Sequence, residues 1–180
     1  MQTLVKGTDF TFLNLSFTKL YSFIFIVLFV SGNLILPQLI HSVPKGGLIF
    51  LPIYFFTLIA AYKFGFKVGI TTALLSPLVN NLIFGMPPTA VLPFIIIKST
   101  LLAFFASIVS YKLNKIKIHY IALVVFLYQI AGSIIEGFIT NSFLKAIQDV
   151  TVGWPGILIQ IFLGFGILTL MAKYDPEKLG

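Results

Sequence analysis

Two ionisable residues lie inside otherwise apolar stretches of this sequence: Lys98 in the run 89–111 and Glu136 in the run 118–140. If these runs cross a membrane, both charges are costly and are expected to face a bundle interior or a cavity. At 1.5 Å per residue, Lys98 is roughly 14 Å and Glu136 roughly 6 Å from the outer end of its helix. Long side chains span that difference, so the two are predicted to pair or to flank one ligand. The alternatives are a purely structural ion pair and a Lys98 side chain that extends to the membrane surface.

Other polar residues share a helical face with Glu136 or lie in neighbouring apolar runs. The stripe around Glu136 consists of Gln129, Gly132, Ser133, Glu136 and Thr140, which helical spacing places on one side. Asn80 and Asn81 lie in the run 66–84, and Gln160 lies in the run 154–172. For Asn80, Asn81, Gln129 and Gln160, ligand contact and interhelical hydrogen bonding are both open. Glycines at four-residue spacing, such as Gly65 and Gly69, favour close helix packing.

The composition is typical of a protein that is embedded in lipid. The chain has 180 residues, of which 58% are hydrophobic and 9% charged, with a mean hydropathy of +1.05. Soluble domains are roughly half apolar and a quarter charged. The absence of cysteine excludes disulfides, thiolate metal sites and cysteine nucleophiles. The two histidines, His41 and His119, lie in different loops, so no metal site is predicted.

The apolar runs predict an all-α membrane protein, a compact bundle of six transmembrane helices in a single domain, 1–180. A helix needs about 20 apolar residues to cross the hydrocarbon core. The six expected helices are 20–39, 48–62, 66–84, 89–111, 118–140 and 154–172.

Lysine counting predicts the orientation. Nine lysines fall on one side of the expected bundle: Lys6, Lys19, Lys63, Lys67, Lys112, Lys115, Lys117, Lys173 and Lys178. Only Lys45 and Lys145 fall on the other. Because cytoplasmic loops are enriched in basic residues, both termini are predicted to be cytoplasmic in a multi-pass cell-membrane protein. The net charge of +7 then reflects loops that face anionic lipid, and no nucleic acid is expected as a partner. Trp154, at an outer helix end, is either a cap over a pocket or an interfacial anchor.

The sequence lacks common nucleotide-binding and catalytic motifs. It has no Walker motif, no His-Glu-x-x-His run and no Gly-x-Ser-x-Gly elbow. We therefore expect no enzymatic activity, no catalytic residues and no cofactor. Solute uptake with energy supplied by partners is the favoured class, and an oligomeric channel or a membrane assembly scaffold is the alternative.

Three segments carry a family resemblance. They are Ile49-Phe50-Leu51-Pro52-Ile53-Tyr54, the segment 60–69, and the segment 76–88, which begins with Ser76-Pro77-Leu78 and ends with Gly85-Met86-Pro87-Pro88. These motifs resemble the substrate-binding S components of energy-coupling factor (ECF) transporters. By motif the resemblance covers about residues 35–110, and by size and expected topology it covers the whole chain.

The resemblance implies a subunit that binds a vitamin or related micronutrient from the outer face. Its implied partners are a membrane coupling subunit and two cytoplasmic ATPases, which reorient it in a prokaryotic plasma membrane. The ligand is implied to lie among the last three helices and the outer loops. Those regions hold Lys98, Gln129, Glu136, Asn141, Trp154 and Gln160, with His41, Asn80 and Asn81 at the other outer loops.

Two departures from the family pattern bear on partner and ligand. The first helix lacks the Ala-x-x-x-Ala pair with which many S components dock on the coupling subunit. Relatives with the Gly-Met-Pro-Pro element often carry an acidic residue where this chain has Lys98. The reversed charge implies a different ligand, in the direction of a carboxylate or phosphate.

Overall fold

The structure, a computed structural model, describes residues 20–173, with Lys145 described by its backbone alone. The elements in chain order are α1 (Leu20–Ile40), α2 (Gly46–Phe50), the 3-10 turn η1 (Pro52–Tyr54), α3 (Phe55–Phe64), α4 (Phe66–Phe84), α5 (Leu92–Leu113), α6 (Ile118–Thr140), α7 (Phe143–Ala146), α8 (Gln148–Thr151) and α9 (Trp154–Lys173). The N-terminal and C-terminal lysines Lys6, Lys19 and Lys178 of the orientation argument lie outside the described residues.

Within residues 20–173, five helices are long and apolar enough to cross a membrane: α1, α4, α5, α6 and α9. Their bounds agree with the expected spans to within three residues. Left-handed residues end several of them, with Gly85 after α4, Asn114 after α5 and Asn141 after α6. Glycine and asparagine adopt this conformation most readily, which explains why these helices stop where they do. The five spans are typical of a multi-pass membrane protein.

The expected helix 48–62 is wrong as a single rod. The chain breaks at Leu51, whose φ of 48° and ψ of 44° separate α2 from η1 and α3. Pro52 contributes to the break, because a proline disfavours the right-handed helical conformation of the residue before it. The apolar piece Pro52–Phe64 that remains is shorter than the five long helices. The expected loop 141–153 likewise contains the short helices α7 and α8.

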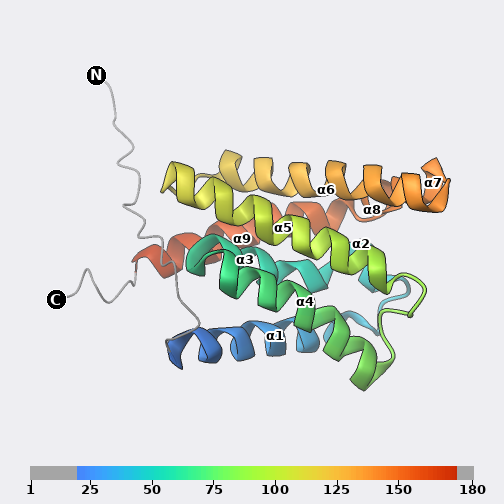
Figure 1. Cartoon of the computed structure of the whole chain (residues 1–180), viewed down its shortest axis with the longest axis horizontal. Helices are drawn as coiled ribbons and strands as arrows, with labels where there is room; N and C mark the ends of the chain where they lie inside the picture. Colours follow the sequence, from blue (N-terminus) through green and yellow to red (C-terminus); the bar gives the residue numbers. More distant parts are fainter. Residues whose placement is uncertain (1–19, 174–180) are drawn as a thin grey trace.

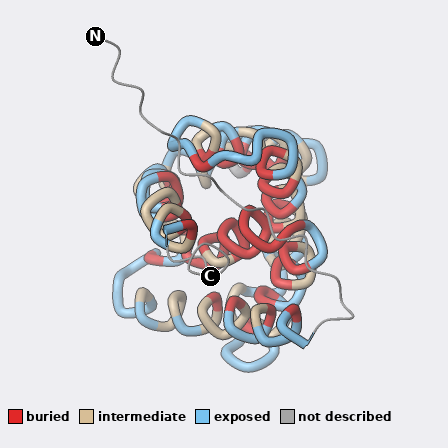
Figure 2. Tube along the Cα trace, turned by 90° about the vertical axis from the view of Figure 1, so that its left-hand side faces the viewer, coloured by how far each residue is buried: buried red, intermediate tan, exposed pale blue. Residues whose placement is uncertain are grey.

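The broken segment is tolerated because it lies inside the protein. In α3 every residue except Phe56 is buried, and the helix contacts α1, α4, α5 and α9. Irregular backbone at membrane depth is stable where protein, rather than lipid, surrounds it. Figure 2, which looks along the bundle, shows buried residues turned inward and exposed ones around the outside.

The two ends of the bundle differ in character (Figure 1). At one end, here called the lysine end, α1 begins and α9 ends, and the turns between α3 and α4 and between α5 and α6 lie there. The described lysines of this end are Lys63, Lys67, Lys112, Lys115, Lys117 and Lys173. At the other end, here called the distal end, lie α2, the segment 85–91, α7 and α8.

A buried asparagine joins three helices in the core. The Nδ2 of Asn33 on α1 donates to Thr57 Oγ1 at 3.1 Å and to Ser76 Oγ at 3.0 Å, on α3 and α4 respectively. Its Oδ1 accepts from the backbone N–H of Phe56 at 3.1 Å. That N–H belongs to the first turn of α3, where backbone donors lack a partner within the helix. Asn33 therefore caps α3 and ties it to α1 and α4.

Close packing of α4 on α3 depends on Gly69. A Cβ added at Gly69 would lie 2.5 Å from Ala61 Cβ and 2.7 Å from Ala61 Cα, whereas one added at Gly166 on α9 would meet no atom within 4 Å. We expect Gly69→Ala to cost about 1–3 kcal/mol, the usual effect of overpacking. The matched control Gly166→Ala is expected to be neutral or slightly stabilising through helix propensity. Unfolding titrations of both variants in one detergent test this, and equal effects would contradict the tight α3–α4 contact.

Candidate binding site

A cavity of about 300 Å³ lies among the segments of the distal end. Its lining comes from parts of the chain that are far apart in sequence. The lining residues are Pro37, His41, Gly47, Leu48, Leu51, Pro52, Ile53, Tyr54, Asn80, Met86, Pro87, Pro88, Val91, Phe94, Ile95, Lys98, Glu136, Gln148 and Asp149. A mostly apolar wall with a few convergent polar groups is the usual character of a small-molecule site.

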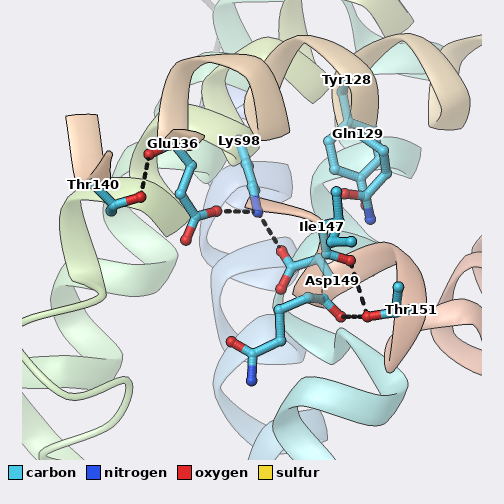
Figure 3. A network of polar contacts seen from close by, with 9 residues as sticks. Lys98, Tyr128, Gln129, Glu136, Thr140, Ile147, Asp149 and Thr151 are labelled. Carbon is cyan, nitrogen blue, oxygen red and sulfur yellow. Dashed lines mark hydrogen bonds and ion pairs between the residues drawn. The ribbon is translucent and has the colours of Figure 1, made fainter. Parts of the chain in front are cut away.

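The charged part of the wall is a three-residue cluster, here called the charge triad: Lys98 on α5, Glu136 on α6 and Asp149 on α8 (Figure 3). The Nζ of Lys98 lies 2.6 Å from Glu136 Oε2 and 2.7 Å from Asp149 Oδ2. Lys98 is only 2% exposed, while the two carboxylate side chains keep 15% and 16% of their surface. A buried ammonium between two carboxylates is well compensated, so the triad fixes α8 against α5 and α6.

Gly132 makes room for the lysine. A Cβ at this position would lie 2.5 Å from Lys98 Cγ, so the aliphatic stem of Lys98 crosses α6 where no side chain stands. The ammonium then reaches Glu136, which lies one helical turn farther along α6. Gly132, the small residue in the stripe around Glu136, thus allows the ammonium of Lys98 to reach Glu136.

A second polar layer lies beside the cavity, nearer the lysine end. The hydroxyl of Tyr128 donates to Gln160 Oε1 at 2.8 Å and accepts from Gln129 Nε2 at 3.1 Å. The Tyr128 ring packs on that of Tyr54, a cavity-lining residue, with centroids 5.5 Å apart. Gln160 therefore forms an interhelical hydrogen bond from α9 to Tyr128 on α6, and Gln129 bonds to the same hydroxyl from within α6. The ring of Tyr54 lies between this layer and the cavity.

The predicted site residues divide into two groups. Lys98, Glu136, Asn80 and His41 line the cavity. The others lie outside its lining: Gln129, Gln160, Asn81, Asn141 and Trp154.

Three residues of the second group have visible structural roles. Asn81 Nδ2 donates to the carbonyl of Pro87 at 2.7 Å and so holds the segment 85–91 in place. Asn141 ends α6 in the left-handed conformation. Trp154 is 58% exposed at the start of α9, as suits an interfacial anchor.

Sequence reasoning missed Asp149, which lies in the expected loop 141–153. A signal was present, because Glu136 and Asp149 are the only acidic residues between positions 10 and 174. In a chain with so few acids, a carboxylate in a connecting loop is the natural partner for a buried lysine. Sequence reasoning also missed Tyr54, which lines the cavity beside η1.

Parts of two of the three segments 49–54, 60–69 and 76–88 line the cavity, and no residue of the segment 60–69 does. From the first motif, Leu51, Pro52, Ile53 and Tyr54 line the cavity. From the third, Asn80, Met86, Pro87 and Pro88 do so.

Among residues 20–173, no three His, Asp or Glu side chains lie close enough together to hold a metal ion. Comparison with protein family models, with curated proteins and with solved structures yields no match for this chain. The cavity and the residues that line it are therefore the features of the molecule that point to a function.

Proposed function

We propose that this protein is the solute-capture subunit of an ECF-type importer, an S component that binds a micronutrient at the distal end of the bundle. The observation that carries the proposal is the roughly 300 Å³ cavity, which combines an apolar wall with a buried charge triad. Ionisable groups at membrane depth usually mark a ligand or ion pathway. The S-component motifs support the same assignment because they supply much of the cavity wall.

Partners supply the energy in this proposal. The sequence contains no phosphate-binding loop, so concentrative uptake needs a membrane coupling subunit and ATPases from separate chains. With no Ala-x-x-x-Ala pair on α1, we place the coupling contact on the lysine end and on other helices. Co-expression of a tagged chain with a coupling subunit and ATPases of the same organism is expected to give a stable complex. Isolation of the tagged chain alone, or as a large homo-oligomer, would favour the channel or scaffold alternative.

The proposal includes an orientation, with the lysine end in the cytoplasm and the distal end outside. The natural chain contains no cysteine, so single cysteines can report this directly. We expect His41→Cys, at the distal end, to react with a membrane-impermeant maleimide added to intact cells. Lys115→Cys, an exposed position at the lysine end, should react only after the cells are permeabilised. Reaction in the opposite order would overturn the orientation.

Ligand binding is tested with a panel of vitamins and related micronutrients on the purified protein in detergent. We expect at least one compound to raise the melting temperature and to appear as a one-to-one adduct in native mass spectrometry. A ligand present at 100 times its Kd stabilises the folded state by about 2.7 kcal/mol, which is readily measured. If no compound of the panel stabilises the protein, the solute-capture proposal fails.

A further inference from the structure

The charge triad leaves the cavity with an unbalanced negative charge. Two carboxylates, Glu136 and Asp149, oppose the one ammonium of Lys98. Apart from Tyr54, the remaining described lining residue with an ionisable side chain is His41, which is exposed at the end of α1. With its three groups ionised, the triad carries a net charge of −1. In a largely buried site such an excess favours a ligand of the opposite charge.

The triad also presents unused acceptors. Lys98 contacts Oε2 of Glu136 and Oδ2 of Asp149, and no described residue donates to Oε1 of Glu136 or Oδ1 of Asp149. In Figure 3 the second oxygen of each carboxylate points away from the lysine nitrogen. An ionised carboxylate forms strong hydrogen bonds with charged N–H donors. Two such oxygens on one cavity wall therefore select for a donor-rich, cationic group.

Lys98 is correspondingly unsuited to bind an anion. Lys98 is 2% exposed, and its ammonium engages both carboxylates within 2.7 Å. A ligand carboxylate or phosphate would have to displace one of these partners and then lie beside the released acid. A lysine at position 98, where similar sequences often carry an acid, implied an anionic ligand when considered alone. The structure adds two carboxylates beside this lysine, and their combined negative charge exceeds its positive charge.

We propose that the cavity takes a small organic cation, with an ammonium or protonated amine N–H group on the second oxygens of Glu136 and Asp149 and an apolar body against the opposite wall. This inference rests on the proposed solute-capture function. The rings of Tyr54 and Phe94 and the prolines Pro37 and Pro52 supply flat apolar surface for that body. A volume of about 300 Å³ is at the lower end of the range for ligand pockets, so the ligand is small.

The test sorts the binding panel by charge and then changes the charge of the wall. Thiamin and pyridoxamine represent cations, pyridoxine and riboflavin neutral compounds, and nicotinate, pantothenate and biotin anions. We expect the largest rise in melting temperature from a cation. For that compound, Glu136→Gln and Asp149→Asn should each raise Kd about 10- to 100-fold, as expected for loss of a charge-assisted hydrogen bond. Each single variant keeps one ion pair with Lys98, so its fold should survive.

The double variant Glu136→Gln/Asp149→Asn reverses the triad charge from −1 to +1 and provides the sharper readout. We expect it to lose the cation and to be stabilised more by anions than the natural protein is. Strongest binding of an anion or a neutral compound by the natural protein would overturn the cation assignment and leave solute capture standing. So would unchanged cation affinity in the double variant. Absence of binding by compounds of all three charge classes would overturn solute capture and the cation assignment together.

Discussion

Replacing Lys98 with methionine is expected to lower the free energy of unfolding by about 3–5 kcal/mol, the usual cost of removing one partner from a buried ion pair. The reason is the geometry of the charge triad, in which Glu136 and Asp149 are both within 2.7 Å of the lysine Nζ. Without the ammonium, two carboxylates face each other with no described cation between them. Methionine keeps the apolar stem that crosses Gly132, so the loss reports on charge and not on packing.

Two controls make the Lys98 result specific. Lys112→Met removes an exposed lysine from the same helix and should change stability by less than about 0.5 kcal/mol. The triple variant Lys98→Met/Glu136→Gln/Asp149→Asn should recover most of the loss, because it removes all three charges together. Unfolding titrations in detergent measure each value. A Lys98→Met protein as stable as the natural one would show that the triad does not form.

Replacing Asn33 with leucine is expected to cost about 2–4 kcal/mol, since the change leaves three buried groups without their partner. The groups are the hydroxyls of Thr57 and Ser76 and the backbone N–H of Phe56. A buried polar group that loses its hydrogen bond costs about 1–3 kcal/mol, and the two hydroxyls regain part of this by turning to carbonyls of their own helices. Leucine has the same number and branching of side-chain heavy atoms as asparagine, which limits the packing contribution.

The matched control for Asn33 is Gln38→Leu on the same helix. Gln38 makes one partly buried hydrogen bond of 3.3 Å to Asn80, so its loss should cost less than about 1 kcal/mol. Thermal unfolding of the two variants side by side measures the difference. Equal effects would mean that Asn33 does not join α1, α3 and α4 in the way the hydrogen bonds indicate.

The long helices could be predicted from sequence because their high hydropathy is enough to identify them. In α4 and α6 a predominantly apolar run ends at a residue that adopts the left-handed conformation, Gly85 or Asn141, and the expected bounds match. The break at Leu51 could not be predicted from hydropathy. Pro52 is compatible with the first turn of a helix as well as with a kink, and the surrounding helices decide between these outcomes.

The candidate site was predictable only in part, for a similar reason. Lys98 and Glu136 stand out because a charge in an apolar run is costly. Asp149 lies in a polar connection, where a carboxylate is ordinary, and only the packing of α8 brings it to Lys98. Gln129 and Gln160 have the residue type and depth of ligand contacts, yet Tyr128 lies between them and satisfies part of their hydrogen bonding. Tertiary packing decides which polar residues line the cavity and which only form hydrogen bonds within the bundle, and the local sequence does not encode that packing.

The measurement closest to the central claim is the Kd of a stabilising micronutrient for a protein whose cavity is filled. Gly47 lines the cavity and has no atom within 4 Å of an added Cβ, so its backbone can accept a side chain. We expect Gly47→Trp to place bulk at this part of the wall and Val91→Trp to add bulk from a second lining segment. Gly166→Trp, at an open position that does not line the cavity, is the control. We predict that the Gly47→Trp/Val91→Trp protein loses binding while Gly166→Trp retains it. Unchanged affinity in the filled variant would contradict solute capture in this cavity.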